Sequence, residues 1–236
     1  YMGLGKYREA EPFLKECFDK RTSILGENHL ETLDSMNDLA VLYSRQGHYD
    51  KALPLYIICL EQWKSTLGEN HPYTLTSMTN VAALYHKQGQ YEKGRPLCIK
   101  CLEQRKSTLG ENHPDTLESM SNLALLYANQ DQYDKALPLY ITCLEQRKST
   151  LGENHPSTLT MMSNLAIFYY EQGQSDKARP LFIKCLEKYK STLGENHPST
   201  LESMANLAMF YDEQGEYKNA RSLRAEFNRD SCCTCS

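Results

Sequence analysis

The chain has 236 residues, of which 40% are hydrophobic and 24% are charged, and 26 Lys and Arg stand against 30 Asp and Glu for a formal net charge of −4. A slightly acidic chain without a basic run lacks the electrostatic footprint of a nucleic-acid-binding protein. The sequence contains neither an apolar run of roughly 20 residues, the length that spans a bilayer, nor a signal segment, so we expect a cytoplasmic protein.

An eight-residue motif, STLGENHP, occurs at 65–72, 107–114, 149–156 and 191–198, and a near copy, SILGENHL, occurs at 23–30. The five copies start at 23, 65, 107, 149 and 191, so the period is 42 residues throughout. A fixed period of this size indicates one structural unit copied in tandem. We therefore expect an array of about five and a half repeats.

Each repeat carries two helical patterns. In the repeat at 114–155 apolar residues recur at helical spacing, first at Leu117, Met120, Leu123, Ala124 and Tyr127 and then at Tyr133, Ala136, Leu137, Tyr140, Cys143 and Leu144. The break between them reads NQDQ here and RQGH, KQGQ, EQGQ or EQGE elsewhere, with Gly where a helix can end in a left-handed residue. Such a short turn predicts antiparallel helix pairs in an all-α fold.

The repeated motif has the features of a connector between repeats. Its glycine suits the end of one helix and its proline suits the first turn of the next. We therefore expect its histidines to be capping or loop residues, not metal ligands or catalytic groups. They are His29, His71, His113, His155 and His197.

Five cysteines share one position of the repeat: Cys17, Cys59, Cys101, Cys143 and Cys185. Equivalent positions in successive helix pairs lie about 20 Å apart, from two helix layers of ~10 Å each. A disulfide needs Cα atoms within about 7 Å, so we expect these cysteines to be reduced and to pack as small hydrophobic residues.

The pattern Leu-Ala-x-x-Tyr, then Gly-x-Tyr, then Ala-x-x-x-Tyr/Phe-x-x-Cys resembles the tetratricopeptide repeat (TPR). The 42-residue form with the LGENHP connector is similar to the repeats of kinesin light chains and nephrocystin-3-like proteins. The resemblance covers residues 1–228. It implies an α-solenoid of antiparallel helix pairs wound into a right-handed superhelix, whose first helices line a concave groove for a partner's peptide or helix.

The period also predicts the boundaries. Residues 1–29 form a truncated repeat that supplies only a second helix, at about 7–23, and we expect the partner of that helix upstream of Tyr1. Complete repeats follow at 30–71, 72–113, 114–155 and 156–197, with a last repeat at 198–228.

Residues 229–236 form a Cys-rich polar tail that we expect to be disordered. An alternative is lipid attachment, because the last four residues match C-a-a-X, although the middle pair is not aliphatic. A structural zinc site is less favoured, since it needs four ligands.

Nothing in the sequence predicts an enzyme. Gly-rich phosphate loops, His-x-x-x-His zinc patterns and nucleophile elbows are all lacking. Cys143 and His155 are separated by about three helical turns, which is too far for a thiolate–imidazole pair. We expect no catalytic residue, metal or cofactor.

By the resemblance, the groove is lined by the outward faces of the first helices. The predicted groove residues are Asn37, Asp38, Val41 and Arg45; Asn80, Ala83, His86 and Lys87; Asn122, Leu125 and Asn129; Asn164, Ile167 and Tyr170; and Asn206 and Met209. An asparagine can donate to one backbone carbonyl and accept from one backbone N–H. We hypothesise that the repeated asparagines hold the backbone of an extended peptide, as similarly placed asparagines do in kinesin light chains. The alternative is that they bond to neighbouring helices.

The charges along this predicted groove are uneven. Arg45 and Lys87 lie toward one end, whereas the other end carries Glu171, Glu202, Asp212 and Glu213. Kinesin light chain grooves are basic and favour acidic, tryptophan-containing motifs. The present pattern instead favours a ligand that has its own charge asymmetry.

Two classes of function follow. The first is an adaptor that binds peptide segments of other proteins, kinesin-type cargo or motor partners among them. The second is a structural or assembly module, either a spacer in a larger sensor protein or an array that stacks end to end through the uncovered N-terminal helix. Trp63 stands where other repeats have Arg21, Arg105, Arg147 and Tyr189, and we expect it to be exposed, as a partner contact or as a covered side-chain stem.

Overall fold

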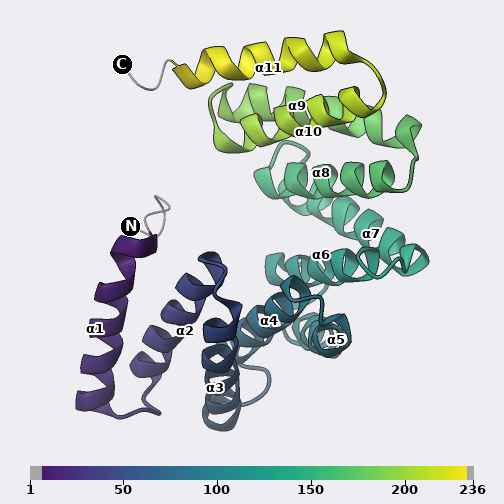
Figure 1. Cartoon of the computed structure of the whole chain (residues 1–236). Helices are drawn as coiled ribbons and strands as arrows, with labels where there is room; N and C mark the ends of the chain where they lie inside the picture. The colour runs from purple at the N-terminus through teal and green to yellow at the C-terminus, as the bar shows by residue number, and fades with distance from the viewer. Residues whose placement is uncertain (1–6, 233–236) are drawn as a thin grey trace. The chain divides into compact units, whose positions relative to one another are not determined.

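In the computed structural model of the chain, residues 7–232 are described, and they form eleven α-helices and no strand (Figure 1). The helices are α1 (Tyr7–Leu25), α2 (Leu30–Arg45), α3 (Tyr49–Leu67), α4 (Pro72–Lys87), α5 (Tyr91–Leu109), α6 (Pro114–Ala128), α7 (Tyr133–Leu151), α8 (Pro156–Glu171), α9 (Ser175–Leu193), α10 (Pro198–Glu213) and α11 (Tyr217–Cys232). The predicted all-α fold of tandem helix pairs is confirmed.

The even-numbered helices are the first helices of the repeats and the odd-numbered ones are the second helices. The chain divides into an N-terminal unit, residues 1–130 with α1–α6, and a C-terminal unit, residues 131–236 with α7–α11. Within each unit every helix packs against the next one along the chain. In the N-terminal unit α3 and α5 each pack against two successive first helices, and α9 does so in the C-terminal unit.

The connector histidines cap the first helices. Each of the five is the N-cap residue of the helix that follows it, with ψ between 137° and 141°. Its Nδ1 accepts the backbone N–H two residues later at 3.1–3.3 Å. This bond satisfies an amide that the helix leaves without a partner, so the expectation of capping residues is confirmed.

The turns within the repeats need a left-handed residue. Four of them place Gly there, whereas the turn between α6 and α7 has Asp131, with φ 56°. Aspartate adopts this conformation more readily than most residues, because its short side chain bonds locally. Tyr133 supplies such a bond, since its hydroxyl donates to Asp131 Oδ1 at 2.5 Å.

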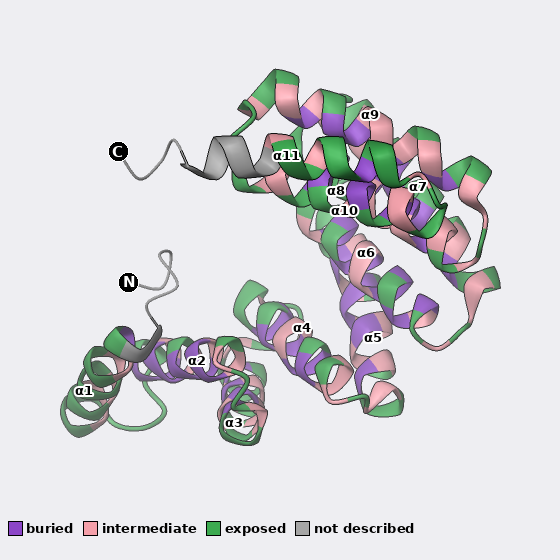
Figure 2. Ribbon diagram, turned by 45° about the horizontal axis from the view of Figure 1, so that its top comes forward, coloured by how far each residue is buried: buried purple, intermediate pink, exposed green. Residues whose placement is uncertain are grey.

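Apolar residues that face neighbouring helices form the core (Figure 2). In the N-terminal unit one cluster contains Leu39, Ala40, Tyr43, Ala52, Tyr56, Val81 and Leu84. In the C-terminal unit a cluster contains Ala166, Ala178, Phe182, Leu186, Met204, Leu207 and Phe210. Small residues lie where helices approach most closely: a Cβ on Gly94 of α5 would lie 3.1 Å from the carbonyl oxygen of Ala82 in α4.

The repeated cysteines are free, as expected, and four of them are at most 2% exposed. Burial raises the pKa of Cys59 and Cys185 to about 12, so both thiols stay protonated at neutral pH. Cys17 is exposed, since no first helix covers that side of α1 in the described residues.

The prediction for Trp63 was wrong. This side chain is only 2% exposed, packs with Leu33, Met36 and Cys59, and stacks on the Tyr73 ring with centroids 5.5 Å apart. The position faces the start of the next first helix. Arg105 occupies it in the following repeat, is also buried, and donates to the carbonyl of Asp115 and the hydroxyl of Ser119, both at 2.9 Å. Trp63 therefore belongs to the core and is not a partner contact.

The last helix, α11, runs through Cys232, four residues beyond the repeat boundary that the period predicts. Residues 233–236, half of the Cys-rich tail at 229–236, lie outside the described residues. None of the helices in the described part is long and apolar enough to cross a membrane.

Replacing His113 by Ala should lower the stability of the chain by about 1 kcal/mol, because α6 loses the acceptor for the amide of Asp115. Thermal and urea unfolding, followed by circular dichroism, measure the change. His48→Ala is the matched control, since His48 precedes α3 without a side-chain capping bond. Equal losses in the two variants would show that the capping bond is not the cause.

The fluorescence of Trp63, which is the only tryptophan of the chain, reports its burial directly. We expect the folded protein to emit at shorter wavelength than the urea-unfolded chain and to resist acrylamide quenching, because the indole is shielded from water. Emission and quenching equal to those of N-acetyl-tryptophanamide would contradict the buried position.

Candidate functional site

The predicted groove residues lie on the first helices, and none of the sixteen is buried. Seven are exposed: Asp38, Arg45, Ala83, Lys87, Leu125, Asn129 and Met209. The other nine are half-buried. Leu125 and Met209 are large apolar side chains that are 44% and 42% exposed. The positions that resemblance assigns to the groove are therefore accessible within each unit.

Helices α4 and α6 are neighbours in the N-terminal unit (Figure 1). A pocket lies between them. Its lining consists of Thr79, Ala82, Ala83 and His86 of α4, Cys98 of α5, and Asn122, Leu125 and Leu126 of α6. Four of these eight are predicted groove residues, namely Ala83, His86, Asn122 and Leu125. The structure thus brings together predicted residues from two successive repeats.

The predicted groove residues did not include Cys98, which forms the floor of this pocket. One repeat earlier the same position is Tyr56, and in the two repeats that follow it is Tyr140 and Phe182. These three rings are 1–4% exposed. A thiol in place of a ring leaves space between α4 and α6. The departure from the 42-residue pattern at Cys98 was the signal that could have revealed the pocket.

The floor of the pocket is apolar in character. Burial raises the pKa of the Cys98 thiol to about 11, and the nearby Cys101 adds to the rise, so the thiol is neutral at pH 7. The Thr79 hydroxyl already donates to the carbonyl oxygen of Leu75 at 3.0 Å. A ligand group in this space therefore meets mainly methyl groups and sulfur.

The rim of the pocket is polar and partly held in place. The side-chain amide of Asn129, in the turn after α6, contacts Nε2 of His86 across the two repeats. Burial lowers the pKa of His86, and Lys87 lowers it further, which favours the neutral imidazole that can accept a hydrogen bond.

The repeated asparagines differ in their bonding. Asn80 donates to the side-chain oxygen of Asn37 at 3.4 Å, so the alternative of bonding between neighbouring helices applies to this pair. The side-chain amides of Asn122, Asn164 and Asn206 make no hydrogen bond to any described residue and are half-buried. Their donors and acceptors are therefore free to meet a ligand.

The equivalent position in the C-terminal unit, between α8 and α10, is occupied by the protein's own rings. Phe182 lies 5.5 Å from Phe210 between ring centroids, and Tyr170 lies 6.4 Å from Phe182 and 5.8 Å from Phe210. Burial and a hydrogen bond to Glu213 raise the pKa of Tyr170 to about 12. Tyr170, one of the predicted groove residues, is half-buried beside this ring cluster, and its role in a groove stays a prediction.

Charges on the first helices differ between the two units. In the N-terminal unit Arg45 and Lys87 are exposed at the ends of α2 and α4, and Lys87 lies 5.8 Å from the centroid of the Tyr49 ring. In the C-terminal unit Glu171 is exposed as a residue, although partial burial of its carboxyl group raises the pKa of that group. Asp212 is paired with Arg224 of α11.

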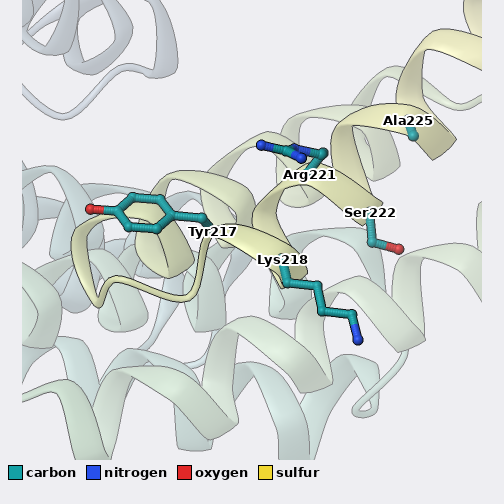
Figure 3. A pocket seen from close by; sticks show the side chains of 5 residues that line it. All are labelled: Tyr217, Lys218, Arg221, Ser222 and Ala225. Atoms are coloured by element: carbon teal, nitrogen blue, oxygen red, sulfur yellow. The ribbon is translucent and has the colours of Figure 1, made fainter.

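A second surface depression lies on α11, lined by Tyr217, Lys218, Arg221, Ser222 and Ala225 (Figure 3). All five side chains project from this single helix, so no second element encloses a ligand there. Among the described residues, no group of three or more His, Cys, Asp or Glu side chains could hold a metal ion.

Comparisons with known proteins agree with this architecture. The tetratricopeptide repeat model matches residues 1–57, 45–93, 78–140, 120–179 and 157–223. Among solved structures, a candidate kinesin light chain from Podosopora anserina with nearly identical TPR-like repeats has a TM-score of 0.71 and 29% identity, over 86% of this chain and 95% of that one. A comparison with curated protein sequences finds no match.

Two further structures share the fold at lower identity. BtubC (BKLC) from P. vanneervenii has a TM-score of 0.75 and 17% identity, over 97% of this chain and 92% of that one. The quorum sensor NprR, in complex with its cognate peptide NprX, has a TM-score of 0.68 and 18% identity, over 94% of this chain and 62% of that one. Since the family model matches almost the whole length, the chain belongs to the tetratricopeptide repeat family.

Proposed function

We propose that the chain is a non-catalytic adaptor that binds peptide segments of partner proteins along the exposed faces of its first helices. The observation that carries the proposal is the pairing, on α6, of an unbonded asparagine amide with an apolar pocket. Asn122 lines the same pocket as Leu125 and Cys98. A peptide needs both elements, because its backbone is polar and its side chains supply the apolar contacts.

The asparagines give affinity that does not depend on peptide sequence. Each free amide can donate to one backbone carbonyl and accept from one backbone N–H, and an extended peptide offers both. Asn122, Asn164 and Asn206 recur once per repeat on successive first helices. The pocket and the charged positions then distinguish one sequence from another.

The charged positions support a ligand with segments of both signs. Arg45 and Lys87 of the N-terminal unit suit acidic residues, whereas Glu171, Glu202 and Glu213 of the C-terminal unit suit basic ones. Kinesin-type cargo or motor partners are one class that we include in this proposal. The free cysteines of the described residues support a reducing compartment such as the cytoplasm.

The peptide-bound structure of NprR supports the proposal at the level of the fold. That protein, which shares the fold of this chain, has been solved in complex with its cognate peptide NprX. The chain is also similar to a candidate kinesin light chain with nearly identical TPR-like repeats.

One observation favours assembly as a second candidate function. On α1, Phe13 is 61% exposed and Cys17 is exposed, whereas their equivalents one repeat later, Leu55 and Cys59, pack in the core. A second copy of the chain could cover this side of α1 in an end-to-end assembly.

Replacing both Asn122 and Asn164 by Ala should weaken binding of a peptide selected from a random peptide display by at least about tenfold, since each lost backbone bond contributes about 1 kcal/mol. Isothermal titration measures the affinity, and circular dichroism checks the fold. The double variant Asn112→Ala/Asn154→Ala is the matched control, because these asparagines are exposed in the connectors. Unchanged affinity in the first variant would contradict the asparagine mechanism.

Sedimentation over a concentration series separates the two candidate functions. The adaptor should keep the mass of one chain, 27.1 kDa, at all concentrations. An assembly module should grow in mass with concentration, and Phe13→Ser should reverse that growth because it removes the exposed ring from α1. Growth that Phe13→Ser reverses would favour assembly over the adaptor.

A further inference from the structure

The pocket between α4 and α6 has an internal counterpart that shows what normally fills it. Two periods of 42 residues further along, α8 and α10 repeat the arrangement within the C-terminal unit. The counterparts of four lining residues are larger there. Ala83 corresponds to Ile167, His86 to Tyr170, Cys98 to Phe182, and Leu126 to Phe210.

In the counterpart, aromatic rings occupy the space. Phe182 and Phe210 are 1% and 0% exposed, and their centroids lie 5.5 Å apart. One repeat before the pocket, Tyr56 fills the equivalent space between α2 and α4. Its side chain is 4% exposed and packs with Val81 and Leu84. Three of the second helices, α3, α7 and α9, thus carry a ring at this position, whereas α5 carries Cys98 there.

We propose that the pocket between α4 and α6 binds the single aromatic ring of a phenylalanine or tyrosine side chain in a peptide ligand. The ligand ring takes the place of the ring that the repeat supplies elsewhere. That the ring belongs to a peptide rests on the function proposed above. Binding of the ring itself rests on the lining of the pocket alone.

The lining suits such a ring. Ala82, Ala83 and Leu126 offer methyl groups, and a sulfur atom beside an aromatic ring makes a favourable contact, which Cys98 supplies. Asn122 lies in the same lining, so its free amide can hold the backbone of the residue whose ring is bound. Side chain and backbone of one residue are thus recognised together.

The size of the pocket decides between rings. Its volume is about 70 Å³, whereas a closed cavity that holds benzene measures ~150 Å³. The pocket therefore encloses only part of a single ring, and the rest of the ring lies at the open mouth beside the exposed Ala83 and Leu125. A two-ring indole leaves a larger share of its area outside the pocket.

Three small probes test the ring preference: N-acetyl-phenylalaninamide, N-acetyl-leucinamide and N-acetyl-tryptophanamide. Methyl NMR of the intact chain, read at Leu125 and Leu126, measures binding of each. We expect saturable shifts with the phenylalanine probe and about tenfold weaker binding of the tryptophan probe, because less of its apolar area can be buried. The proposal is overturned by equal or tighter binding of the tryptophan or leucine probe, or by no binding of the phenylalanine probe.

Two variants fill the pocket with residues that the array already uses. Cys98→Phe introduces at the floor of the pocket the residue found at Phe182. Ala83→Ile introduces at the mouth of the pocket the residue found at Ile167, and Ala83 is exposed, so this change does not disturb the core. Each should abolish the shifts caused by the phenylalanine probe. The control is Ser107→Phe, which adds a ring to an exposed position of α5, the helix that carries Cys98. Shifts that persist in Ala83→Ile, or that vanish equally in Ser107→Phe, overturn the proposal even if Cys98→Phe does not fold.

The same variants separate this proposal from the proposed function. If a display-selected peptide needs Asn122 and Asn164 but binds Ala83→Ile unchanged, the peptide function stands and the ring pocket fails. If the phenylalanine probe binds as predicted while the asparagine variant keeps full peptide affinity, the pocket stands and the backbone mechanism fails.

Discussion

The hydrogen bond from each connector histidine to the start of the next helix is the interaction on which the array depends. Because His29, His71, His113, His155 and His197 all use Nδ1 to accept the amide two residues later, every first helix begins at the same position of the repeat. A fixed start determines which residues face inward and which face outward. The exposed row of asparagines and the buried Leu-Ala-x-x-Tyr pattern both follow from that one constraint, since residues on a helix keep their angular positions once its start is fixed.

The same constraint explains where the repeats are free to differ. Most inward positions meet two or three neighbouring helices and keep their size, as Ala52, Ala136 and Ala178 do at 0% exposure. Outward positions on the first helices meet solvent, and they vary from Ser44 to His86 to Tyr170. Variation at these positions changes the ligand that the array can bind without changing the array. Cys98, like Gly94 and Trp63, varies at an inward position, and Cys98 lines the pocket.

The period allowed much of the structure to be predicted. Helix pairs and capping histidines repeat five times and buried cysteines repeat four times, so each inference was supported by several copies. Trp63 was predicted wrongly because it occurs once, and because Arg105 at the same position suggested a solvent-facing site. In fact that guanidinium is buried and hydrogen-bonded. The pocket was missed for a related reason: the sequence gives the size of Cys98, but only packing against Leu126 and Ala82 shows that nothing else fills the space.

The loss of a ring at Cys98 also has an energetic consequence. Truncating a buried phenylalanine in a core costs about 3–5 kcal/mol, and the cost depends on how far the surroundings relax. Gly94, one turn earlier on α5, allows α4 and α5 to approach closely, with the Ala82 carbonyl 3.1 Å from where a Cβ would lie. The opening between α4 and α6 nevertheless remains. In a repeat array stability is nearly a sum over repeats and their interfaces, so the neighbouring ring-filled repeats offset what this interface lacks. A tandem repeat fold can therefore tolerate one imperfectly packed interface. A ligand that binds at that interface gains more new contacts than one that binds at a well-packed interface.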